Sequence, residues 1–184
     1  MLSLVVASLL IQATSTYGDF ISVDNGGSWG DWGEVQRCPP MTSARGFSLK
    51  MEKPLGSDGD DTALNGIQLY CTRCTSRDVV GTITSTVGGW GDWTPISWCS
   101  RGNYIKFALK VEKPQGDGDD TAVNSIKMGC SNNSTEEGNN GYWGDFGRWS
   151  GICPLGICGI RTRVERAQGR GDDTALNDVQ LECC

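Results

Sequence analysis

The chain has 184 residues, a formal net charge of −6, 26 glycines, nine cysteines and seven tryptophans, and it contains no histidine. The negative charge disfavours nucleic acid as a partner, because that binding relies on Lys and Arg to release counterions, and makes basic secreted proteins easier electrostatic partners. The lack of histidine removes the commonest activator of a nucleophile and the commonest transition-metal ligand, so we expect no cofactor.

An apolar leader opens the chain at residues 1–18. It runs from Leu2 to Ile11, continues through small residues and carries no charge before Asp19. It is too short to span a bilayer, and no second stretch of about 18 apolar residues follows it. We expect a secretory signal peptide, cleaved after about residue 15 to 18, and a secreted, extracellular protein with no membrane anchor.

Three copies of one unit fill the rest of the chain, residues 19–184, which we predict to be a single domain. We place the copies at 19–78, 79–131 and 132–184. Each copy contains an aromatic phrase, an alternating run, a Gly-Asp-Asp-Thr phrase and a second alternating run that ends in cysteine. The aromatic phrases are SWGDWGEVQRC from Ser28, GWGDWTPISWC from Gly89 and YWGDFGRWSGIC from Tyr142; the Gly-Asp-Asp-Thr phrases begin at Gly59, Gly118 and Gly171.

The alternating runs predict strands. In FSLKMEKP from Phe47 and IQLYC from Ile67, apolar and polar residues alternate with a period of two, which is typical of half-buried strands. The segment between the two runs is rich in glycine and aspartate, which favour turns. No helical periodicity follows the leader, so the chain is predicted to be all-β.

This ordered motif set resembles the vitelline membrane outer layer protein family from about Phe20 to Cys184. The resemblance implies a β-prism, in which three Greek-key sheets surround a pseudo-threefold axis, and a structural place in the outer vitelline layer of an egg. A weak transfer of N-acetylchito-oligosaccharides is the activity it suggests. Copy three departs from the pattern because it lacks Lys-Pro after Glu165, and Cys74 is extra relative to the family's even cysteine set.

The copies also suggest how the cysteines pair, since each has one cysteine after the aromatic phrase and one at the end of the last strand. This predicts Cys38 with Cys71, Cys99 with Cys130, and Cys153 with Cys183 or Cys184. Cys158 and the other terminal cysteine would make a fourth bond. Cys74 is left over, either as a thiol of a monomer or as the link of a disulfide-bonded dimer; we favour a monomer.

Carboxylates recur at two places in each copy. The paired aspartates of the Gly-Asp-Asp-Thr phrase suit turns and caps, with calcium binding as the alternative; they are Asp60, Asp61, Asp119, Asp120, Asp172 and Asp173. The strand-end Glu52, Glu112 and Glu165 precede them and could form the paired carboxylates of a glycosidase, but ion pairs with Lys53, Lys113 or Arg166 are favoured.

All seven tryptophans belong to the aromatic phrases. We favour a place in the core, because large rings dominate core energetics. The alternative is sugar contact, with pyranose faces on Trp32 and Trp93 and sugar hydroxyls on Asp31, Asp92 or Asp145. In the linker between copies two and three, Asn132 and Asn133 both open N-glycosylation sequons.

These patterns favour a secreted, non-catalytic protein that acts as a structural or carbohydrate-binding component of an extracellular coat. The competing hypothesis is an enzyme, a weak glycosyltransferase or glycosidase that uses the paired carboxylates. Threefold repetition of every motif favours the scaffold, because an active site is rarely made in triplicate.

Overall fold

A computed structural model describes residues 18–52, 64–73, 76–112, 123–138, 143–165 and 176–184 of the chain. The leader, the Gly-Asp-Asp-Thr residues with their aspartates, and Cys74 lie outside these residues. The described residues form strands and no helix, and therefore include no helix that could cross a membrane.

Three long antiparallel hairpins form the frame of the molecule. They are β4 (Ser43–Met51) with β5 (Leu64–Thr72), β9 (Tyr104–Val111) with β10 (Val123–Cys130), and β13 (Ile157–Val164) with β14 (Leu176–Cys183). Their registers pair the predicted inward residues, for example Leu49 with Ile67. One face of each hairpin is therefore continuously apolar.

Short strands complete each hairpin into a sheet. Sheet A has the order β1-β14-β13-β2 with β3 also on β13, sheet B has β6-β5-β4-β7 with β8 on β4, and sheet C has β11-β10-β9-β12. The short strands are β1 (Phe20–Ile21), β2 (Asp31–Trp32), β3 (Gln36–Arg37), β6 (Val79–Ile83), β7 (Asp92–Trp93), β8 (Ser97–Trp98), β11 (Thr135–Glu137) and β12 (Asp145–Phe146). The predicted all-β prism of three sheets is confirmed.

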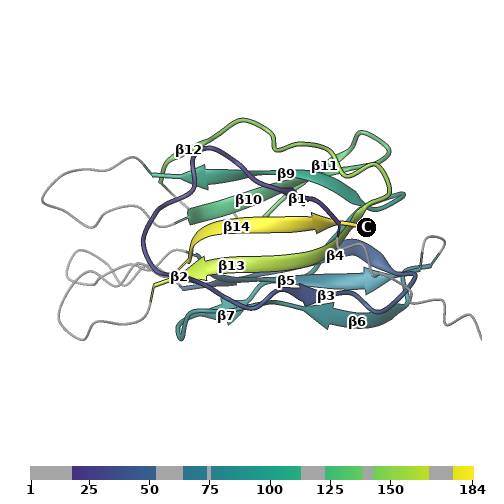
Figure 1. The fold of residues 1–184 in the computed structure, drawn as a ribbon, viewed down its shortest axis with the longest axis horizontal. Helices are drawn as coiled ribbons and strands as arrows, with labels where there is room; N and C mark the ends of the chain where they lie inside the picture. Colours follow the sequence, from purple (N-terminus) through teal and green to yellow (C-terminus); the bar gives the residue numbers. More distant parts are fainter. Residues whose placement is uncertain (1–17, 53–63, 74–75, 113–122, 139–142, 166–175) are drawn as a thin grey trace, which may run out of the picture.

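The sheets are shared between copies of the repeat. The aromatic phrase of copy two supplies β7 to the hairpin of copy one, and that of copy three supplies β12 to the hairpin of copy two. The phrase of copy one supplies β2 to the last hairpin, so sheet A combines both ends of the chain. In Figure 1, β2, β7 and β12 lie at the left, and the C-terminus lies at the right. We call the left end the aromatic end and the right end the cysteine end.

The core fills the space between the three sheets. Its largest fully buried side chains include Tyr104, Phe47 and Phe107, and aliphatic residues of the hairpins surround them. The Phe47 and Tyr104 rings meet edge to face at 5.6 Å. Burial raises the pKa of Tyr104, whose hydroxyl stays protonated and donates to the Ser97 carbonyl at 3.0 Å. The only polar tip of this aromatic cluster therefore has a partner.

Three disulfides tie the copies internally at the cysteine end: Cys38–Cys71, Cys99–Cys130 and Cys153–Cys183. They confirm the predicted pairing of the three copies and select Cys183 as the partner of Cys153. Sequence separations of 33, 31 and 30 residues make each bond worth roughly 3 to 4 kcal/mol in the chain-entropy model.

The predicted fourth disulfide is not formed in this structure. The Cys184 thiol instead forms a hydrogen bond with Cys158, which lowers the pKa of the Cys158 thiol. The two sulfurs are thus neighbours, and a bond between them remains a prediction.

Candidate functional site

The tryptophans are not in the core, contrary to the placement that the sequence favoured. Five are at least one-third exposed, and Trp32 and Trp98 are partly buried; the exposed rings are Trp29, Trp90, Trp93, Trp143 and Trp149. The reason is that the alternating hairpins already fill the interior with aliphatic and phenyl side chains. The aromatic phrases form two-residue strands at the sheet margins, where their rings lie at the surface.

A tight Trp-Gly-Asp turn begins each of these short strands at the aromatic end. Its glycines, Gly30, Gly91 and Gly144, have φ of 81°, 86° and 83°. An added Cβ would lie within 2.3 to 2.6 Å of the backbone at the end of β13, β4 or β9. Only glycine allows the turn to approach the strand end this closely.

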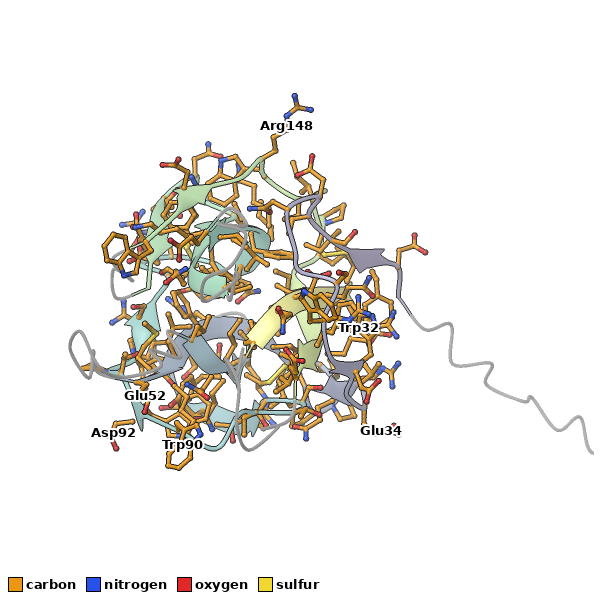
Figure 2. The ribbon with its side chains drawn as sticks, turned by 90° about the vertical axis from the view of Figure 1, so that its left-hand side faces the viewer. Trp32, Glu34, Glu52, Trp90, Asp92 and Arg148 are labelled. Carbon is orange, nitrogen blue, oxygen red and sulfur yellow. A yellow bond between two sulfur atoms is a disulfide. The ribbon has the colours of Figure 1, made fainter. Side chains whose placement is uncertain are left out.

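These turns bring an aspartate and a glutamate to each corner of the prism. Asp92 is paired with Met51, so it lies beside the strand end that continues to Glu52. The other two corners repeat the arrangement with Asp31 beside Val164 and Glu165, and Asp145 beside Val111 and Glu112. Each acid pair therefore combines two copies of the repeat, as Figure 2 shows for Glu52, Asp92 and the nearby Trp90.

The first tryptophan of each phrase is widely exposed at its corner. Trp29, Trp90 and Trp143 are 60%, 59% and 63% exposed. The predicted sugar contacts were Trp32 and Trp93, and these three rings were not among them. The sequence does contain a feature that indicates their exposure, because a Trp directly before a turn glycine lies at the tip of the turn and not inside a strand.

Groups of the hairpins fix the approach to the turn at two of the three corners. The Gly88 amide donates to the Asn65 carbonyl at 2.6 Å, and Lys50 Nζ donates to the carbonyls of Gly88 and Gly89 at 2.8 and 3.0 Å. At the sheet A corner, Gly27 donates to the Asn177 carbonyl at 2.7 Å. The asparagine that ends the Gly-Asp-Asp-Thr phrase is thus a buried anchor for the aromatic phrase.

The second aromatic residue of each phrase lies on the outer face of a sheet. Trp32 lies under the guanidinium groups of Arg161 and Arg163, at 4.9 and 5.9 Å from the ring centroid. Trp93 is 40% exposed. The predicted contacts Trp32 and Trp93 are therefore separated from the exposed tips formed by the first tryptophans, and cations already cover Trp32.

Sheet C repeats this pairing of cations with rings. Lys127 Nζ lies 4.4 Å from the Phe146 centroid and 5.0 Å from that of Trp149, and Lys106 Nζ lies 4.6 Å from Trp149. The outer face of the sheet thus carries positive charge, while the corner at its end carries Glu112 and Asp145.

A cavity of about 600 Å³ opens at the corner between sheets A and C. One wall is the segment from Asn25 to Trp29, and the other is formed by Val111, Glu112 and the turn from Gly144 to Gly147. It brings one exposed tryptophan together with the acid pair of the neighbouring sheet.

A second cavity, of about 430 Å³, lies at the cysteine end. Arg37 and Glu182 line it and form an ion pair of 2.7 Å, in which the Glu182 side chain is only 2% exposed. Cys158 and Cys184 lie in the same wall. Because the charges there are paired, this end is suited to structure more than to ligand recognition.

The described residues contain no group of three or more His, Cys, Asp and Glu side chains arranged to hold a metal ion. Lys53, Lys113 and Arg166, the predicted ion-pair partners of the strand-end glutamates, lie outside the described residues. The sequon residues Asn132 and Asn133 are exposed in the turn after β10, where Asn133 has a φ of 68°.

Sequence comparison connects the whole domain to known proteins. The family model described as Vitelline membrane outer layer protein I (VOMI) matches residues 19–184. A human protein named vitelline membrane outer layer protein 1 homolog is 47% identical over 169 residues, covering 91% of this chain and 84% of the relative. The mouse protein of the same name is 42% identical over 179 residues, covering 97% and 89%.

Solved structures with the same fold include lectins. Calsepa lectin in complex with a bisected glycan has a TM-score of 0.52 at 14% identity, covering 91% of this chain and 97% of the lectin. The mannose-binding lectin from Champedak has a TM-score of 0.52 at 12% identity, covering 92% and 99%. At these identities the likeness establishes the β-prism fold and no more.

Proposed function

Because this chain belongs to the vitelline membrane outer layer protein I family, we propose that it is a secreted structural component of an extracellular coat and that it binds glycans through its aromatic end. The leader at residues 1–18 and the internal disulfides support secretion, since disulfides persist in oxidising compartments. The membership of this family supports the coat role.

The observation that carries glycan binding is the threefold exposure of Trp29, Trp90 and Trp143 beside acid pairs. An exposed indole offers a flat apolar face to the C–H face of a pyranose. A carboxylate accepts short, charge-assisted hydrogen bonds from sugar hydroxyls. The two groups together provide stacking and orientation for one sugar residue at each corner.

Three corners on one end also suit a coat protein. A branched or repeating glycan that reaches two corners converts the second contact into an intramolecular event, which raises avidity without a new contact. The glycan held by Calsepa lectin and the mannose binding of the Champedak lectin support the suitability of the fold for such ligands.

The test is a glycan array and a titration with chitin oligosaccharides on the oxidised protein. We expect the triple variant W29A/W90A/W143A to lose binding. Trp149→Ala, which removes an exposed ring from the outer face of sheet C, is the matched control and should retain it. Cooperative urea unfolding of each oxidised variant verifies that it is folded.

Two results would overturn the proposal. The first is the absence of binding to any glycan at millimolar concentration, and the second is an equal loss in Trp149→Ala. Sugar turnover is followed in the same samples, because the acid pairs are also the groups a glycosidase would use. Turnover that disappears in Glu52→Gln would make the protein an enzyme.

A further inference from the structure

The cavity between sheets A and C has a more specific chemistry than the other features of the aromatic end. We propose that this corner pocket binds a pyranose carrying a protonated amino group in preference to the N-acetylated form of the same sugar. This inference rests on the proposed glycan binding and assigns one ligand class to one of the three corners.

The size and lining of the pocket suit a small part of a glycan. Its volume of about 600 Å³ falls within the range of about 300–1,000 Å³ typical of small-molecule sites. Trp29 on one wall supplies an exposed ring, and Glu112 and Asp145 on the other supply carboxylates. The three side chains come from segments far apart in the sequence, so only the folded prism assembles them.

The walls of the pocket are held together by a buried contact. Asn25 Nδ2 and the Gly147 amide both donate to the Leu109 carbonyl, each at 3.0 Å. A Cβ on Gly147 would lie 2.5 Å from Asn25 Cγ, so the two segments pack without a gap. The pocket is therefore preformed, and a ligand need not order its walls.

Asn25 also leaves one acceptor unused. Its Oδ1 is buried without a hydrogen-bond donor, although the residue lines the pocket. A buried acceptor without a donor is unfavourable. The oxygen is closed to solvent and lies against Gly147, so it belongs to the packed wall of the pocket.

The charge of the lining selects the ligand class. Among the described lining residues the charged side chains are Glu112 and Asp145, and no Lys or Arg is present. The neighbouring Lys127 ammonium is held over the Phe146 ring and does not line the pocket. Anionic sugars are repelled by this lining and by the net charge of −6.

A protonated amine gains from both kinds of group in the pocket. It donates to a carboxylate in a charge-assisted hydrogen bond, and the face of Trp29 attracts the cation. An N-acetylated sugar keeps the stacking but loses the charge. The difference favours the amine, which is why we assign an amino sugar rather than a neutral one.

The experiment compares tetramers of glucosamine and of N-acetylglucosamine by titration calorimetry with the oxidised protein. At about pH 5.5, where the amine is charged, we expect the glucosamine tetramer to bind about tenfold more tightly, equivalent to about 1.4 kcal/mol. The preference should shrink as the pH rises to about 8.5, where the amine loses its proton, and as salt is added.

Matched variants locate the binding. Trp29→Ala, Glu112→Gln and Asp145→Asn should abolish the preference. Trp149→Ala and Glu34→Gln are the matched controls, because they remove an exposed ring and an exposed carboxylate that do not line the pocket, and they should retain the preference. Equal effects of the two sets of variants would overturn this inference and leave glycan binding intact. Absence of binding by either tetramer and by all arrayed glycans would overturn both. A lysine tetrapeptide that binds as tightly as the amino sugar would show that the pocket recognises amines of protein side chains.

Discussion

Substituting Gly91 by alanine tests the geometry that forms the corners. The new Cβ would lie 2.3 Å from the Met51 carbonyl oxygen and 2.6 Å from the Glu52 amide nitrogen, and the residue has a φ of 86°. The left-handed conformation alone costs about 1–2 kcal/mol for a non-glycine residue. With displacement of the backbone added, we expect a loss of about 2 to 3 kcal/mol in unfolding free energy.

Urea unfolding of the oxidised protein measures this loss, and calorimetry should show a Tm lower by about 5 to 10 °C, since about 2–4 °C corresponds to 1 kcal/mol at this chain length. Gly89→Ala is the matched control, because a Cβ there meets nothing within 4 Å. Both substitutions reduce the entropy of the unfolded chain equally. A difference below about 0.5 kcal/mol between the two variants would refute the reasoning.

Three further predictions concern the charged and modifiable groups. Burial raises the pKa of Asp178, although the amide of Val179 and the charge of Arg163 act in the opposite direction. The ionised carboxylate therefore destabilises the fold at pH values above the folded-state pKa, and this destabilisation disappears below the unfolded-state pKa. Asp178→Asn should thus increase the free energy of unfolding at neutral pH and give no gain at about pH 3. Air oxidation should join Cys158 to Cys184, with both thiols then resistant to alkylation in a mass-spectrometric assay; alkylation of both in the fully oxidised protein would contradict this. Secretion from a eukaryotic host should yield a glycan on Asn133, whose side chain forms none of the hydrogen bonds that hold Asn132 to Ser100 and Ser134; an unchanged mass after glycosidase treatment would exclude it.

The strands, their inward faces and the three disulfides could be predicted because they depend on local signals. Alternation with a period of two identifies which residues face inward, as for Phe47 and Leu49. The position of one cysteine at the end of each last strand identified Cys71 and Cys130 as bonded residues and left Cys183 and Cys184 as alternatives, of which the structure selects Cys183. The alternating runs and the cysteine positions recur in all three copies, so a strand that is hard to identify in one copy could be placed by comparison with the other two.

The partners of the aromatic phrases could not be predicted in the same way. A two-residue strand such as β7 has no periodicity of its own, and nothing in the sequence tells that Asp92 pairs with Met51 of the preceding copy. The tryptophans were placed in the core for their size, although the turn glycines that follow Trp29, Trp90 and Trp143 indicate tips. Local conformation decided their position, and hydrophobicity did not.

Sheet A contains β1 and β14, the first and last of the described strands, so the two ends of the chain lie side by side. Phe20 is paired with Glu182, and the Cys183 amide donates to the Asp19 carbonyl at 2.9 Å. During synthesis, the strands β1, β2 and β3 have no hairpin to join until β13 and β14 have been made, so the prism closes only after β14 has been synthesised. Because the two ends meet, a short peptide could join them and the chain could be opened at another of its connections, such as the one between β10 and β11, without breaking any sheet.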